Sequence, residues 1–183
     1  QIHFAPAASA PDSKGNLKSL NVAGIASTYD YDDKGRRIKE TDGTGAVTTY
    51  SFDVNGNELT RTVTRTVGAT TRTETTTSVY DADNRLVQQT DPTGAITRTT
   101  YNSAGKPVTQ TDALGRITKH SYDANARPTR TEHPDGTAES TEYDANGNET
   151  ARSDRQGRTT RMVYDEPDRL VVTTHPDGTS TRT

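Results

Sequence analysis

The sequence predicts an all-β protein, an antiparallel β-meander of 21-residue repeats with two strands per repeat, forming an extended, curved sheet of spiral or solenoid-like form. Three observations predict it: regularly spaced aromatic residues, two turn signals in each repeat, and short runs rich in Thr, Val, Ile and Arg between the turns. Only 27% of the 183 residues are hydrophobic, which is too little for an ordinary globular core. The net charge of −3 and the many β-forming residues argue against disorder.

Aromatic residues, each followed by Asp or Asn, mark the repeat. They recur at intervals of 21 residues, with one interval of 28. The repeat aromatics are Tyr31, Phe52, Tyr80, Tyr101, Tyr122, Tyr143 and Tyr164. One aromatic on every second strand would form a ladder on one face of the sheet and supply much of the apolar burial. A stacking platform for carbohydrate is the alternative role for these rings.

Two turn signals follow each aromatic. The first stands four residues later, at Gly or at a residue such as Asn84, Ala126 or Asp168; the second stands fourteen residues later, often closing an Asp/His-Pro-x-Gly turn of type I. The predicted turn glycines are Gly35, Gly45, Gly56, Gly94, Gly105, Gly115, Gly136, Gly147, Gly157 and Gly178. The runs between turns have strand lengths and no helical periodicity.

The 28-residue interval predicts one lengthened hairpin between Leu59 and Tyr80. A two-residue loop at Gly68 and Ala69 would give it one all-threonine face. That face pairs Thr60, Thr62, Thr64 and Thr66 with Thr77, Thr75, Thr73 and Thr71, respectively. On the other face Arg65 would stand opposite Arg72, which is unfavourable unless Glu74 reaches both.

Residues 1–27 lack the repeat aromatics and are expected to be a linker or an irregular N-terminal segment, and residues 28–183 form the repeat array. The array is expected to be truncated, because Thr183 lies nineteen residues after Tyr164, short of the next aromatic. A bare strand edge would then await further repeats or identical chains. No window approaches 18 apolar residues, so no membrane span is expected.

No catalytic residue, metal site or cofactor is expected. The chain has no Cys, and no Ser, His and acid trio or phosphate-binding loop has the required context. His133 and His175 share a turn motif but would lie roughly 19 Å apart, too far for one ion. The turns at 53–57 and 144–148 resemble the start of a calcium loop without its terminal Glu. The 22 basic and 25 acidic residues are interleaved, so nucleic-acid binding is not expected.

The repeated Tyr-Asp-x-x-Gly-Arg/Asn motif, followed by an Asp-Pro-x-Gly-type turn and a Thr-containing strand, resembles the YD/Rhs repeat family over residues 29–183. In that family the repeats form a spiralling sheet, a hollow shell around a toxin domain in Rhs and Tc-type proteins or the barrel of teneurin-like proteins. Seven repeats are too few for a closed shell. The segment 91–94 (Asp-Pro-Thr-Gly) matches the core of the family's self-cleavage motif but occupies an ordinary mid-array turn position.

The resemblance implies a non-catalytic scaffold, a piece of the shell or wall of a bacterial secreted polymorphic toxin or cell-surface protein. Its implied partners are further repeats, identical chains at the sheet edges and an encapsulated toxin domain. A second hypothesis is the protomer of an extracellular filament or adhesion protein that assembles through open strand edges. A third is an ice-binding surface on the threonine face of the long hairpin.

Overall fold

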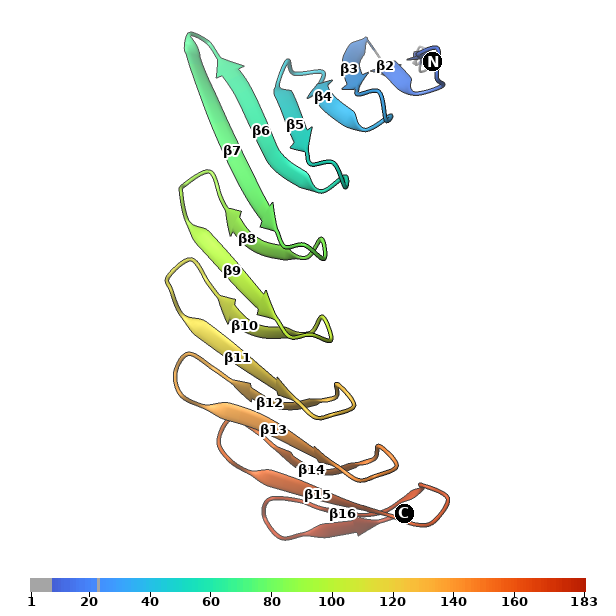
Figure 1. Ribbon diagram of the computed structural model, residues 1–183, viewed down its shortest axis with the longest axis vertical. Helices are drawn as coiled ribbons and strands as arrows, with labels where there is room; N and C mark the ends of the chain where they lie inside the picture. The colour runs from blue at the N-terminus through green and yellow to red at the C-terminus, as the bar shows by residue number, and fades with distance from the viewer. Residues whose placement is uncertain (1–7, 23) are drawn as a thin grey trace, which may run out of the picture. The chain divides into compact units, whose positions relative to one another are not determined.

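The computed structural model describes residues 8–22 and 24–183. These residues contain seventeen β-strands and no helix (Figure 1). The paired strands are antiparallel and follow one another in chain order, which confirms the all-β meander with two strands per repeat. The chain divides into two units, residues 1–96 and 97–183, which are described separately.

In the first unit each strand pairs with the next along the chain. Its strands are β1 (Ala8–Pro11), β2 (Leu17–Val22), β3 (Ile25–Tyr31), β4 (Arg37–Thr41), β5 (Val47–Phe52), β6 (Glu58–Val67), β7 (Thr70–Tyr80) and β8 (Leu86–Thr90). Strands β6 and β7 form the lengthened hairpin, with the register that the sequence predicted.

In the second unit the same alternation continues without an insertion. Its strands are β9 (Ile96–Tyr101), β10 (Pro107–Thr111), β11 (Ile117–Tyr122), β12 (Pro128–Glu132), β13 (Ala138–Tyr143), β14 (Glu149–Ser153), β15 (Thr159–Tyr164), β16 (Leu170–Thr174) and β17 (Ser180–Arg182). Strand β9 begins at the last residue of the first unit.

The N-terminal segment differs from the linker expected at residues 1–27. Strands β1 and β2 and the start of β3 lie within it, while residues 1–7 and 23 are outside the described part of the chain. The turn from Asp12 to Asn16 has the same hydrogen bonds as the later turns, with Gly15 at a φ of 87°. The sequence expectation missed this repeat because Pro11 occupies the position of the aromatic residue before the turn.

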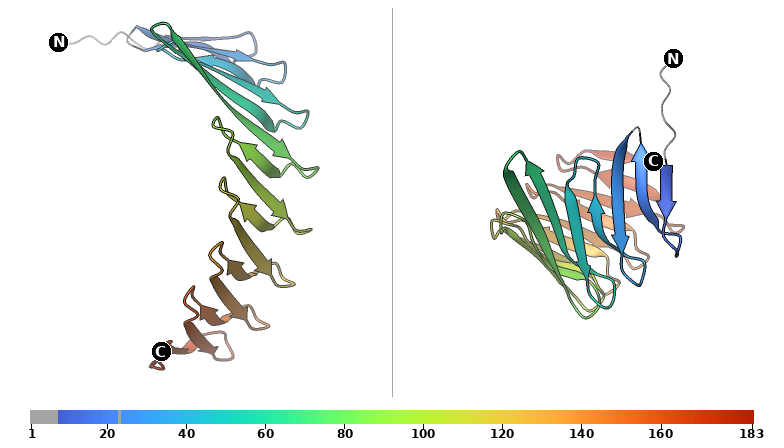
Figure 2. Two further views of the ribbon diagram at one scale, coloured as in Figure 1. Left: turned by 90° about the vertical axis from the view of Figure 1, so that its left-hand side faces the viewer. Right: turned by 90° about the horizontal axis from the view of Figure 1, so that it is seen from above.

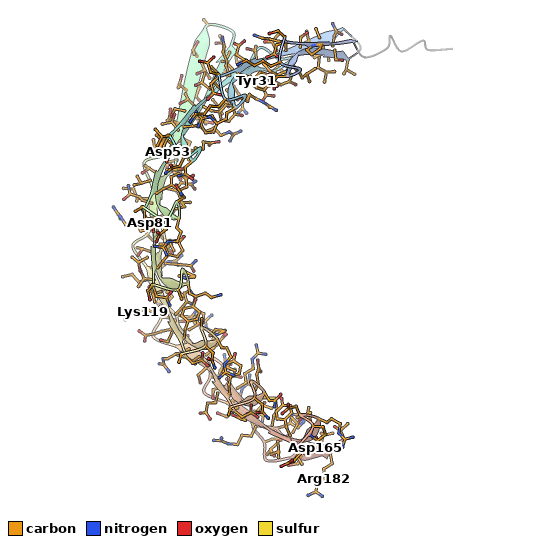
Figure 3. All side chains as sticks on the ribbon, turned by 45° about the vertical axis from the view of Figure 1, so that its right-hand side comes forward. Tyr31, Asp53, Asp81, Lys119, Asp165 and Arg182 are labelled. Carbon is orange, nitrogen blue, oxygen red and sulfur yellow. The ribbon has the colours of Figure 1, made fainter. Side chains whose placement is uncertain are left out.

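Each unit is a single layer of strands with side chains on both faces (Figures 2 and 3). Among the described residues, the only buried hydrophobic side chains are Ala46 and Ala151. Large apolar residues such as Val54 and Leu114 are 83% and 77% exposed. Stability must therefore come from the backbone ladder, the turns and partial burial between neighbouring strands rather than from a closed core.

The turns at the two ends of the strands share one backbone geometry. In the turn after Tyr31, the Gly35 N–H donates to the Asp32 carbonyl at 3.0 Å and the Asp32 N–H donates to the Arg36 carbonyl at 2.9 Å. The turn at 91–95 repeats both bonds. The predicted turn glycines all have positive φ, between 74° and 103°, and Asn84, Ala126 and Asp168 have φ near 60°. This is a type I turn followed by a residue in the left-handed region.

A β-bulge accompanies the turns on the aromatic side. On the opposite side, the pairings β2–β3, β4–β5, β6–β7, β10–β11, β12–β13, β14–β15 and β16–β17 run without a shift. Tyr122 stands opposite Pro128 while Ser121 stands opposite Arg130, so Thr129 is an extra residue in β12. The pairing of β12 with β13 on the opposite side runs without a shift. Bulges increase local twist and bend the strand that carries them. The two edges of each unit therefore differ, although the turn backbones are alike.

Replacing Ala126 with Gly should stabilise the protein by about 1 kcal/mol, because an L-residue with a side chain is strained at a φ of 59°. Gly115→Ala is the matched opposite change, since an added Cβ would meet no atom within 4 Å at a φ of 78°. It should destabilise by a similar amount. Equilibrium denaturation measures both effects, and equal stability of the two variants would contradict the assignment.

Candidate functional site: the bonded turn edge

The aspartate that follows each repeat aromatic caps its own turn. The Asp32 Oδ1 atom accepts the N–H groups of Lys34 and Arg36 at 3.0 and 2.9 Å. Asn102 uses its Oδ1 in the same way, accepting from Ala104 and Lys106 at 3.0 and 2.9 Å. The acid or amide in the Tyr-Asp signature is therefore the group that closes the turn.

These hydrogen bonds stabilise the ionised carboxylates. The backbone N–H of Arg36 and then its side chain hold the pKa of Asp32 below its ordinary value of 3.8. The Asn57 side chain does the same for the pKa of Asp53. Lowered pKa values occur at turns throughout both units, at Asp12, Asp42, Asp81, Asp91, Asp112, Asp123, Asp135, Asp144, Asp154, Asp165 and Asp177.

The residue four positions after the capping Asp joins one repeat to the next. Arg36 binds the Asp32 carboxylate at 2.7 Å and donates to the Asp53 carbonyl at 3.0 Å. Its guanidinium also lies 4.8 Å from the centre of the Phe52 ring. In the second unit Arg127 makes the equivalent contacts with Asp123, the Asp144 carbonyl and the Tyr143 ring, the last at 4.4 Å.

Where Asn replaces this Arg, it bonds to the next turn through a side chain. In the first unit Asn57 and Asn55 donate to the Asn84 Oδ1 at 2.7 and 2.9 Å. In the second unit Asn148 and Asn146 both donate to the Asp168 Oδ1 at 2.8 Å. The left-handed residues Asn84 and Asp168 thus accept bonds that a Gly at the same position could not.

Lysines add further links between turns of the first unit. The Lys14 Nζ donates to the Asp33 carbonyl and the Lys34 Nζ donates to the Val54 carbonyl, both at 3.1 Å. We call the turns so connected the bonded turn edge: 12–16, 32–36, 53–57 and 81–85 in the first unit, and 123–127, 144–148 and 165–169 in the second. A link also occurs on the opposite edge, where Arg155 binds Asp135 at 2.6 Å.

The tyrosine hydroxyls form a second set of bonds between repeats. Tyr122 donates to the Pro107 carbonyl at 2.9 Å, and Tyr143 donates to the Pro128 carbonyl at 3.1 Å. Tyr31 bonds to the Leu17 carbonyl in the same way, at 3.0 Å. Each acceptor is the first residue of the strand after the preceding turn, where the bulge disturbs the ladder. This contact supports a structural role for the repeat aromatics.

Phe52 and Tyr164 depart from this pattern. Phe52 has no hydroxyl, and its ring lies under the Arg36 guanidinium. The Tyr164 hydroxyl lies 3.9 Å from the Met162 sulfur. The aromatic position thus tolerates loss of the carbonyl bond, which makes these two repeats natural controls.

The threonine face of the long hairpin is a row of hydroxyl pairs. Thr62 bonds to Thr75 at 3.0 Å and Thr64 to Thr73 at 3.3 Å. Thr66 and Thr71 lie 3.1 Å apart. On the other face Arg65 stands opposite Arg72, and Glu74 contacts Arg72 at 2.9 Å.

The histidines and calcium-like loops serve the sheet and its turns. His120 lies 3.3 Å from the Thr131 hydroxyl and 3.2 Å from the Gln110 side-chain oxygen. The Asp144 carboxylate accepts three backbone N–H groups of its own turn. Within residues 8–22 and 24–183, no group of three or more His, Asp or Glu is placed to hold a metal ion. His3 lies outside the described residues.

The described part of the chain has no helix that is long and apolar enough to cross a membrane. Residues 12–47, 31–70, 80–116, 101–138 and 143–180 match the model of the family described as RHS Repeat. The chain belongs to the RHS repeat family. The first match begins in the segment expected to be a linker, in agreement with β2 and the turn before it.

Several solved structures resemble this RHS repeat chain. They include the crystal structures of TcdB2-TccC3-TEV and of TcdB2-TccC3 without the hypervariable C-terminal region, each with a TM-score of 0.49, and the Tc holotoxin pore of Photorhabdus luminescens, with a TM-score of 0.47. Each is 14% identical, and the match covers 88% of this chain but 12% of the other. No curated protein matches the sequence.

Replacing Tyr122 with Phe removes one hydroxyl that satisfies the Pro107 carbonyl. The RHS repeat array should lose about 1 kcal/mol of unfolding free energy. Tyr164→Phe is the matched control, because that hydroxyl is bonded to the Met162 sulfur at 3.9 Å. Chemical denaturation compares the two, and equal losses would argue against a role for the carbonyl bond.

Acidification should unfold the array. Because the pKa values of the capping aspartates are lowered in the folded chain, their stabilisation is present above the ordinary value of 3.8 and is lost as the pH falls below it. Far-ultraviolet circular dichroism during an acid titration measures the loss of strand signal. A variant with Asn at Asp32, Asp81 and Asp123 should lose less signal on acidification, because Asn102 already caps a turn. An unchanged titration curve would contradict this.

Proposed function

We propose that this RHS repeat array is a non-catalytic structural wall, a part of the shell of a secreted polymorphic toxin or of a surface protein. The observation that carries this proposal is the bonded turn edge, in which each turn is tied to the next by side-chain bonds. Such links restrict the movement of one repeat against the next, although the sheet has no closed hydrophobic core. Membership of the RHS repeat family supports the same role.

The chemistry of the turns supports a scaffold rather than an enzyme. A carboxyl that acts as a general acid near neutral pH needs a raised pKa. Hydrogen bonds to the turn's own backbone and side chains lower the pKa values of these aspartates. These carboxylates are engaged in holding the turns closed.

The single-layer sheet suits a wall that has water on both faces. Large apolar side chains are sparse, and the strands carry Thr, Arg and Glu beside isolated Val or Ile. We propose further repeats or identical chains as neighbours at the strand edges, an enclosed toxin domain as cargo, and secretion or display at the cell surface.

The threonine face of the long hairpin is a weaker candidate for binding ice. Six of its eight hydroxyls already bond to one another in pairs across β6 and β7, and the Thr60 hydroxyl bonds to Ser51, which limits their availability to order water. Two strands also twist, so the row is not a flat lattice. Thermal hysteresis measurements test this idea, and a solution of the protein that shows no thermal hysteresis would contradict it.

Electron microscopy and light scattering over a concentration series test the wall proposal on the full chain. A shell segment should remain a discrete particle, whereas the protomer of a filament should polymerise end to end as its concentration rises. Limited proteolysis of the protein from its natural source adds a second test. A toxin domain carried by the same polypeptide should resist cleavage until acid opens the turns, and a domain cleaved at once at neutral pH would contradict enclosure.

A further inference from the structure

The far half of the β6–β7 hairpin extends past its neighbours in the first unit (Figure 1). Strand β5 pairs with β6 only as far as Thr64, and β8 pairs with β7 only from Thr77 onward. Residues 70–76 of β7 therefore form an open strand edge among the described residues, and we call them the β7 edge. An open edge presents backbone N–H and C=O groups that can pair with another strand.

The loop of the hairpin determines which residues of the β7 edge have their backbone N–H and C=O groups directed away from β6. Val67 pairs with Thr70 across a two-residue loop, and the residues that close such a loop bond to each other. Hydrogen-bonded pairs alternate along an antiparallel ladder. The N–H and C=O groups of Thr71, Thr73 and Thr75 therefore point away from β6, toward the open side.

We propose that the β7 edge pairs antiparallel with the β7 edge of a second copy of this chain, about a two-fold axis at Thr73. Thr73 would exchange two backbone hydrogen bonds with Thr73 of the second copy, and Thr71 would do so with Thr75 of the second copy. Arg72 would then stand opposite Glu74 of the second copy, and Glu74 opposite Arg72 of the second copy. This is a self-complementary interface.

Charge selects this register over its neighbours. The axis could also lie at Arg72 or at Glu74, since the outward-pointing groups of the two copies would still face one another. An axis at Arg72 would place Arg72 opposite Arg72 of the second copy, and an axis at Glu74 would place Glu74 opposite Glu74 of the second copy. Like charges directly opposite each other destabilise a strand pair, and opposite charges stabilise it. Of these three registers, only the one centred on Thr73 gives two Arg–Glu pairs and no like-charge pair.

The β7 edge also lacks the features that usually prevent edge pairing. Residues 70–76 contain no Pro and no Lys, and the pairing of β6 with β7 has no bulge. The Arg72 side chain is 79% exposed and contacts Glu74 of its own strand at 2.9 Å, so both charges lie at the edge. The threonine pairs of the hairpin would continue across the seam through Thr71, Thr73 and Thr75.

This interface is independent of the wall proposal, and its small size predicts a dimer that dissociates on dilution. Because the Arg–Glu pairs are exposed, added salt should weaken the dimer. Sedimentation equilibrium of the full chain over a dilution series measures the association. A chain that stays monomeric at every concentration, or that grows into long polymers, would overturn the proposal.

Charge substitutions give the sharper test. Arg72→Glu alone and Glu74→Arg alone each put like charges opposite each other twice, so each variant should dimerise about tenfold more weakly. An equimolar mixture of the two variants restores two opposite-charge pairs and should form heterodimers. The double variant R72E/E74R should dimerise as the parent chain does. If both variants are folded and the mixture stays as monomeric as each variant alone, the proposed register is wrong.

Disulfide trapping tests the axis directly, since the chain has no Cys. Thr73→Cys would bring two thiols together across the axis, where facing Cα atoms lie about 5.5 Å apart, within disulfide range. Thr66→Cys is the matched control, because Thr66 lies in β6 beyond the part paired with β5. Mild oxidation should give a covalent dimer with the first variant only. Equal cross-linking of both would show random collision and refute the two-fold axis.

Discussion

The hydrogen bonds accepted by the turn aspartates are the constraint on which the rest of this structure depends. A single-layer sheet with two buried alanines cannot obtain its register from core packing. The register must come from the turns, since a slip of one residue would move every side chain to the opposite face. A carboxylate such as that of Asp32 holds the N–H groups two and four residues later and thereby fixes where each strand begins.

The same cap also positions the contacts between repeats. Closing the turn brings Arg36 against the Asp32 carboxylate and over the next aromatic ring, where another of its nitrogens reaches the Asp53 carbonyl. The bulge that follows the turn leaves a carbonyl that the tyrosine of the next repeat can reach, as Tyr122 reaches Pro107. Turn closure, bulge and aromatic contact thus form one motif that recurs along the bonded turn edge.

A polar chain can fold in this way because most of its stabilising contacts are local or lie between adjacent strands. The design leaves both faces wet and tolerates sequence variation at exposed positions such as Leu114. The long hairpin is the exception, because its strands extend past those beside them and leave backbone groups unpaired. A feature that breaks the repeat is therefore where contact with another chain is most readily specified.

The sequence by itself determined the strands, the turns and the register of the long hairpin. These features depend on residues a few positions apart: Gly35 after Tyr31, or the threonines on either side of Gly68. The segment expected to be a linker contains a repeat that has no aromatic residue before its turn. The signal of that repeat is the Asp12 carboxylate, which caps the turn as the other turn aspartates do.

Only the tertiary structure decided the β-bulges, the tyrosine bonds to backbone carbonyls and the links from Asn57 to Asn84. Tyr122 and Pro107 lie 15 residues apart in the chain, and Asn57 and Asn84 lie 27 apart. Whether such residues meet depends on the offset that each bulge introduces between neighbouring strands. That offset arises from the pairing of strands in space, so residue spacing alone could not supply it.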